Sequence, residues 1–161
     1  MNTEALFRPF PLGKKTMRNR IVMAPMTRSK APGGLPNEAI LGYYRRRAEG
    51  EVGLIVTEGV IIEHPGASGY PDVPRIYGED AIEGWGRIVD AVHGAGCLIV
   101  PQLWHVGSVR QRGTEPHPEI GGFGPSAIRH PGLPEGGESL QRKTYSSSEA
   151  GRMSSLPSPP E

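Results

Sequence analysis

Three short apolar runs, separated by two amphipathic stretches, are the feature of this sequence that most restricts its fold. The runs are "RIVMA", "GLIV" and "CLIV", and they begin near residues 21, 53 and 97. Each is short and apolar without alternation, which is typical of a strand buried on both faces. Strands and helices that alternate at this spacing favour parallel pairing through right-handed crossovers. We therefore expect an α/β fold.

The stretches between the runs have helical periodicity. Asn37 is a suitable cap for the first helix and Gly50 a suitable stop. One face of this helix gathers Ile40, Tyr43, Tyr44, Arg47 and Ala48. A loop over 59–79 precedes the second helix, whose predicted apolar face holds Ile82, Trp85, Val89 and Val92, with Gly94 and Gly96 at its end. The basic "YYRRR" could suggest RNA, but a solvated face of the first helix is the favoured interpretation.

Composition divides the chain into a folded part and a tail. Glycine (23) and proline (17) together make up about a quarter of the 161 residues, so loops are extensive. From Ser139 onward the sequence is rich in serine and proline and nearly free of aliphatic residues, so it cannot bury enough surface to offset its ordering entropy. We predict a folded region over 1–134 and a disordered tail over 135–161.

Charge and cysteine content exclude several classes of protein. The net charge of +1 provides no electrostatic footprint for nucleic acid or an anionic membrane, and no apolar stretch is long enough to span a membrane. The single cysteine, Cys97, excludes an internal disulfide and favours a reducing cytoplasm. The five histidines lack metal-ligand spacing, so no metal site is predicted.

Residues suited to ligand contact follow each apolar run. Thr27 comes after the first run, Gly59 follows "TE" after the second, and Gln102 lies just beyond the third. Because parallel strands end at the same edge of a sheet, and ligands of α/β folds bind there, we predict that these three residues lie close together.

Several longer segments, taken in order, resemble one family. "LFRPFPLGKKTMRNRIVMAPMTRS", "GLIVTEG" and "QLWHVG" are similar to the first strands and loops of the Old Yellow Enzyme family of flavin-dependent ene reductases. The resemblance covers residues 5 to about 134. It implies that the chain is the N-terminal portion of a TIM (β/α)8 barrel, which in this family holds FMN at the carboxyl ends of its strands.

The resemblance also implies roles for individual residues. Pro25 and Met26 would present their backbone to the flavin, and Thr27 would hydrogen-bond near its O4 atom. Gly59 would let the backbone approach the ring, while the Gln102 amide, which both donates and accepts, would meet the pyrimidine edge. The substrate pocket would be lined by Tyr70 and Trp104. Two residues keep two interpretations each: His105 is either in the pocket or structural, and Glu58 either meets the cofactor or pairs with a cation.

The reaction implied by the resemblance is hydride transfer from NAD(P)H through FMN to an activated alkene. The family's substrate-binding histidine pair and proton-donating tyrosine have no matching motif here, so no catalytic residue is identified. A complete barrel takes about 250 residues, and we therefore expect a truncated form, whether from gene truncation, altered splicing or a shifted reading frame. Two smaller departures are Pro101, inside a predicted strand, and Ser108, where the family often has arginine.

Two other functions remain open. A non-catalytic fragment could act as an interaction module that self-associates through its open sheet edges. A Rossmann-like nucleotide-binding domain also fits the order of elements, but "HGAGC" follows a helix instead of a strand and so lacks the context of a dinucleotide fingerprint.

Overall fold

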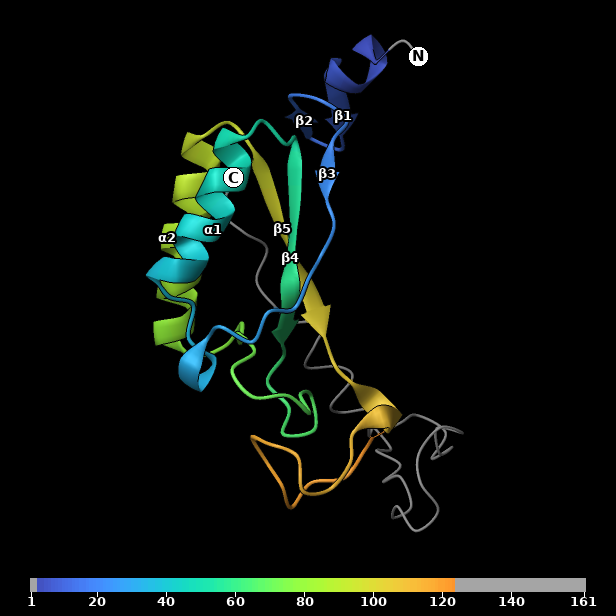
Figure 1. Ribbon diagram of the computed structural model, residues 1–161, viewed down its shortest axis with the longest axis vertical. Helices are drawn as coiled ribbons and strands as arrows, with labels where there is room; N and C mark the ends of the chain where they lie inside the picture. The colour runs from blue at the N-terminus through green and yellow to red at the C-terminus, as the bar shows by residue number, and fades with distance from the viewer. Residues whose placement is uncertain (1–2, 124–161) are drawn as a thin grey trace.

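The computed structural model describes residues 3–123 and has an α/β architecture (Figure 1). Its strands are β1 (Phe10–Leu12), β2 (Lys15–Met17), β3 (Val22–Met23), β4 (Leu54–Ile61) and β5 (Leu98–Trp104). Its helices are α1 (Glu38–Glu49) and α2 (Glu79–Gly94), with short 3-10 turns at Glu4–Phe7, Pro32–Gly34 and Gly107–Val109. The predicted boundary at 134/135 and the predicted disordered tail lie outside the described residues.

The predicted parallel sheet is present. Strands β3, β4 and β5 are neighbours in that order and all run parallel, while β1 and β2 form a separate antiparallel hairpin. Both crossover helices lie on the same face of the sheet (Figure 1). This is the arrangement expected of two consecutive right-handed β-α-β units.

Helix α1 begins as the sequence predicts. The Asn37 side-chain oxygen accepts the backbone N–H of Ile40 at 3.1 Å, and the Asn37 amide donates to the Lys30 carbonyl at 2.9 Å. The cap therefore satisfies an orphan donor of the first turn and ties the helix to the preceding loop. The predicted face is correct, since Ile40, Tyr44 and Ala48 are buried.

The apolar face of α2 is rotated from the one predicted. Trp85 and Val92 are buried as expected, but Ile82 is 51% exposed. The buried positions of this helix are Ala81, Gly84, Trp85, Ile88 and Val92. Gly84 belongs to the buried face because a Cβ there would stand 2.9 Å from the Pro36 carbonyl oxygen, a contact only glycine avoids. The buried face of α2 therefore includes Ala81, Gly84 and Ile88 instead of Ile82, with Pro36 packed against Gly84.

Strand β4 is longer than the sequence predicts. The apolar run suggests a strand that ends at Val56 with a loop from 59, whereas β4 continues to Ile61. The parallel register with β5 shifts between Val56 and Gly59, so β4 has one extra residue at this point. Ile55 and Val60 both belong to the core beneath the helices although they are an odd number of residues apart. This β-bulge therefore reverses which side chains of β4 face the helices.

The β1–β2 hairpin was not predicted, and the residue after it ties both helices to the sheet. The Arg18 guanidinium donates to the Val52 carbonyl, to the Ala95 carbonyl at 3.0 Å and to the Ala48 carbonyl. Ala48 lies in the last turn of α1 and Ala95 is the C-cap of α2. A cation that satisfies these terminal carbonyls also complements the negative ends of the helix dipoles.

Candidate functional site

The loops that follow β3, β4 and β5 gather at the carboxyl end of the sheet (Figure 1). Pro25, Met26 and Thr27 follow β3 in extended chain, and all three are exposed. The segment is fixed to β4, because the backbone N–H of Arg28 donates to the buried Glu58 carboxylate at 3.3 Å. Thr27 is therefore held beside the distal half of β4, although it belongs to no strand.

Gln102 lies opposite Gly59 in the parallel register of β4 and β5. Its backbone N–H donates to the Thr57 hydroxyl at 3.1 Å, and that hydroxyl donates in turn to the Glu58 carbonyl at 2.7 Å. The hydroxyl thus replaces a backbone acceptor where the bulge interrupts the ladder. Pro101, which has no N–H to donate, lies opposite this bulge. Its presence inside β5 therefore costs no hydrogen bond between the strands.

The Gln102 side chain is on the sheet face that the helices leave uncovered. Ile99 packs in the core under the helices, and side chains alternate along β5, so Val100 and Gln102 point to the opposite face. Gln102 is exposed, and its amide has no hydrogen-bond partner among residues 3–123. The structure therefore brings Thr27, Gly59 and Gln102 to the same part of the sheet. Within the described residues, the Thr27 hydroxyl and the Gln102 amide have no hydrogen-bond partner there.

Gly59 makes room for the indole of Trp104. A Cβ at Gly59 would stand 2.4 Å from Cε3 of Trp104, well inside contact distance. Trp104 in turn stacks on Tyr70, with ring centroids 5.6 Å apart and planes inclined by 18°. The two residues predicted to line a substrate pocket thus lie together. The Trp104 indole therefore occupies the space where a Gly59 side chain would be, which is space that the sequence predicted to admit a flavin.

A cavity of about 320 Å³ opens beside Tyr70, beyond the end of β4. Tyr77, Arg75 and the Gly33–Gly34 turn also line it. Its volume is within the range of small-molecule sites, and two phenol rings and a guanidinium supply both apolar and polar contact. Tyr70 therefore connects the Trp104 stack to a cavity large enough for a small ligand.

His105 is bonded to a second histidine, which the sequence did not indicate. Its Nδ1 atom accepts the backbone N–H of Gly107 at 2.9 Å, and its Nε2 atom is 3.1 Å from Nδ1 of His64. His64 Nδ1 also accepts the Gly66 N–H at 3.0 Å, so the proton between the two rings belongs to His105. The structural interpretation of His105 is therefore favoured: it joins the loops after β4 and β5.

We expect the chain to lose stability in acid through His105. Burial, then the neighbouring His64 and Arg110, lower the pKa of His105 below its ordinary value of 6.5. The unfolded chain thus takes up this proton more readily, so the stabilisation is complete above pH 6.5 and is lost as the pH falls through the folded pKa. Urea unfolding between pH 5 and 8 should show a free energy of unfolding that decreases as the pH falls. His105→Phe should make this decrease smaller, whereas a change at the exposed His93 should leave it intact.

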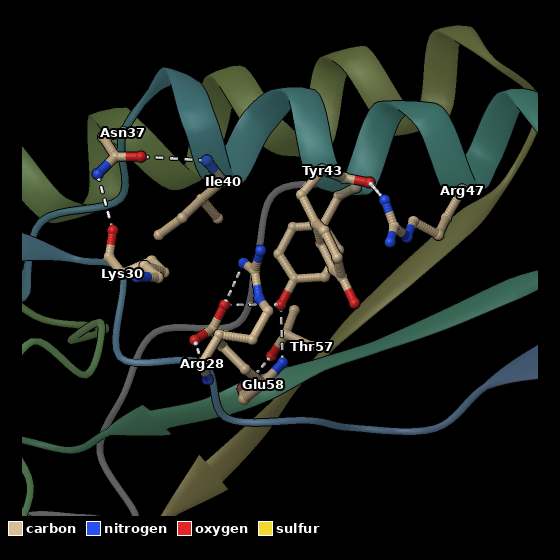
Figure 2. A network of polar contacts seen from close by, with 9 residues as sticks. Arg28, Lys30, Asn37, Ile40, Tyr43, Arg47, Thr57 and Glu58 are labelled. Atoms are coloured by element: carbon tan, nitrogen blue, oxygen red, sulfur yellow. Dashed lines mark hydrogen bonds and ion pairs between the residues drawn. The ribbon is translucent and has the colours of Figure 1, made fainter.

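Glu58 is not at the rim as the sequence suggests, but inside β4 and fully buried. Of its two interpretations, pairing with a cation is confirmed: an Arg28 Nη2 atom is 2.6 Å from Oε1 of the carboxylate. The pair lies on the helix side of the sheet, under α1 (Figure 2).

Among residues 3–123 no group of three potential ligands is arranged to hold a metal ion, and no helix has the length and hydropathy of a membrane span.

Comparison with known proteins identifies the family. The model of the NADH:flavin oxidoreductase / NADH oxidase family matches residues 5–149. This chain belongs to that family. A similar curated protein is 12-oxophytodienoate reductase 7 of Oryza sativa subsp. japonica, 38% identical over 112 residues, which are 70% of this chain and 28% of that protein. The chain thus spans less than a third of the length of this relative.

Solved structures of the family share the fold. Morphinone reductase in complex with tetrahydroNAD is 33% identical with a TM-score of 0.75, covering 92% of this chain and 43% of that one. The Old Yellow Enzyme homologue from Zymomonas mobilis is 34% identical with a TM-score of 0.73, covering 92% and 42%. The three parallel strands and two crossover helices are therefore part of a TIM barrel, as the resemblance implies.

Proposed function

We propose that this chain supplies part of the flavin site of an FMN-dependent NAD(P)H oxidoreductase of the ene reductase type, whose substrates are small activated alkenes. The observation that carries the proposal is the free amide of Gln102, opposite Gly59 on the uncovered face of the sheet, in a chain of a flavin oxidoreductase family. No role for nucleic acid or a membrane is proposed. The single free thiol, the buried Cys97, supports a reducing compartment such as the cytoplasm.

The residues present suit an isoalloxazine edge. Thr27 offers a hydroxyl and Gln102 an amide, and both are exposed and without hydrogen-bond partners in the described part of the chain. A donor and an acceptor on one amide match the adjacent N3–H and O2 of a flavin. Pro25 and Met26 would lie along the ring, and Trp104 with Tyr70 would shape the substrate side. When bound, FMN supplies the hydride chemistry, while these residues orient it.

We expect the 161-residue chain alone to bind FMN weakly. Contacts from Thr27, Gly59 and Gln102 contribute about 0.5–1.5 kcal/mol each, or roughly 2–4 kcal/mol in total before ordering costs. A Kd of 1 mM corresponds to about 4 kcal/mol, so the expected Kd is about millimolar or weaker. We also expect no steady alkene reduction, because the family's proton-donor motif has no match in this sequence.

The test is an FMN titration of the purified chain followed by flavin fluorescence, with NADPH oxidation assayed in the presence of cyclohexenone. Gln102→Ala should raise the Kd by about two- to tenfold, the equivalent of one hydrogen bond. Gln111→Ala changes an exposed glutamine in the loop after β5 and should leave the Kd unchanged. Equal affinities in the two variants would contradict the site, and stoichiometric FMN retained through gel filtration with steady turnover would contradict the weak-binding expectation.

Self-association is the second candidate function, and one observation favours it. The uncovered face and edges of the sheet expose large apolar side chains, including Val22 (48%), Val100 (39%) and Leu103 (63%). Met26, beside the proposed flavin site, is also 63% exposed. Apolar groups on an open parallel sheet favour association with another chain. A second copy of this chain is the partner we propose, with the non-catalytic interaction module as the corresponding function.

A further inference from the structure

The inference concerns Glu58, a carboxylate that the proposed function leaves unused. Its side chain is 0% exposed, and a buried charge is costly unless it is paired and hydrogen-bonded. The bulge places Glu58 on the same side of β4 as Val60, beneath α1. A carboxylate at this position therefore needs hydrogen-bonding partners, and it has them from α1 and from the segment that follows β3.

Three donors converge on the two carboxylate oxygens (Figure 2). Oε1 accepts from Arg28 Nη2 at 2.6 Å and from the Tyr44 hydroxyl at 3.3 Å, and Oε2 accepts from the backbone N–H of Arg28 at 3.3 Å. The Tyr44 oxygen also accepts the backbone N–H of Glu58 at 2.8 Å. Burial raises the pKa of Tyr44 far above its usual range, so its hydroxyl remains a donor at every working pH.

The arginine is itself held in place from the helix side. Its guanidinium carbon is 3.6 Å from the centroid of the Tyr43 ring, which the Arg47 guanidinium also approaches at 3.5 Å. Such cation–π contacts contribute orientation in addition to energy. Arg28 is thus fixed at both its backbone and its side chain. Because the Arg28 N–H belongs to the peptide group that joins it to Thr27, the carboxylate fixes the orientation of that peptide.

We propose that Glu58, through Arg28, is a positioning residue that holds Thr27 in place for the flavin edge. This inference rests on the proposed function. Thr27 has no partner of its own in the described residues, so its place depends on the adjacent peptide. If the Glu58–Arg28 ion pair only stabilised the core, its loss would loosen all neighbouring residues equally. If it positions Thr27, its loss should loosen the segment of Thr27 selectively.

The first experiment needs no flavin. Amide hydrogen exchange of the unliganded chain is followed by NMR in wild type, Glu58→Gln and Val92→Ala. Glutamine keeps the volume but turns one acceptor into a donor, so either the Arg28 N–H or the guanidinium loses its acceptor. We expect exchange of the Arg28 amide, whose acceptor is the Glu58 carboxylate, to accelerate at least tenfold while α1 stays protected. Val92→Ala removes buried methyl groups from α2 and should not accelerate exchange of this amide selectively. Equal acceleration of the Arg28 amide and of α1 in Glu58→Gln would overturn the inference.

The second experiment asks whether Glu58 acts through Thr27. Thr27→Ala and Glu58→Gln should each raise the FMN Kd by about three- to tenfold, the equivalent of one hydrogen bond. The double variant should bind no more weakly than Thr27→Ala alone, because the residue being positioned is already gone. Additive effects would overturn the inference and leave the proposed function intact. Equal FMN affinities in Gln102→Ala and Gln111→Ala would instead overturn the proposed function, and the exchange experiment would still decide whether Glu58 holds the segment.

Discussion

Replacing Arg18 with alanine is expected to lower the free energy of unfolding by about 3 kcal/mol, the value of one to two hydrogen bonds from a charged donor. The change leaves the carbonyls of Val52 and Ala95 without this donor, whereas the Ala48 carbonyl in the last turn of α1 loses Arg18 but keeps the backbone N–H of Glu51. It also removes the positive charge from the negative ends of both helices. Urea unfolding followed by circular dichroism measures the loss.

The matched control is the neighbouring Arg20. Its guanidinium lies 5.5 Å from the Phe10 ring at the exposed surface, so Arg20→Ala should cost less than about 1 kcal/mol. Arg18→Lys should be intermediate, because lysine keeps the charge but lacks the fork of donors that reaches separate carbonyls. Equal losses in Arg18→Ala and Arg20→Ala would show that the contacts to the helix ends contribute little.

Gly59→Ala is expected to lower the free energy of unfolding by about 2 kcal/mol, in the range found for overpacked sites. The new methyl would stand 2.4 Å from Cε3 and 2.7 Å from Cδ2 of Trp104, so the indole must move. Its stack on Tyr70 would then be lost, and tryptophan fluorescence should shift through Trp104, because Trp85 is buried on α2 away from the new methyl group.

Two further variants make the Gly59 result specific. Gly86→Ala introduces the same methyl group on the exposed side of α2, where nothing lies within 4 Å, and should stabilise the helix by about 0.5–1 kcal/mol. In a Trp104→Leu background the cost of Gly59→Ala should largely disappear, because the side chain that it meets is gone. A cost that persists in that background would place the clash elsewhere.

Local patterns were sufficient for the elements whose signals lie within a few residues. Asn37 caps α1 as predicted, and Ile40, Tyr44 and Ala48 form its buried face, because capping and the 3.6-residue period depend only on neighbours in sequence. The parallel pairing of three strands also followed from the alternation of elements. The residues proposed for the flavin came from the resemblance to the family, and their roles remain predictions for the FMN titration to test.

Contacts between distant segments were not readable in the same way. His105 meets His64, which is 41 residues away, and Arg18 reaches Ala95 over 77 residues. Neither pair has a sequence pattern, since the distance along the chain carries no information about which loops or ends will meet. The buried face of α2 was also predicted incorrectly: apolar residues lie on both sides of Trp85, and the segment of Pro36 packs against Gly84 while Ile82 stays exposed.

The sequence by itself determined the α/β class, the parallel pairing of the strands and the family, because these depend on local periodicity and on motifs that stay together along the chain. Tertiary structure alone decided which side of β4 each residue faces. Alternation from Ile55 would place Thr57 under the helices, yet the bulge opposite Pro101 puts Glu58 there and turns the Thr57 hydroxyl to the Gln102 N–H. A strand has a side-chain period of two, so one extra residue reverses every later position, and only pairing with β5 reveals it.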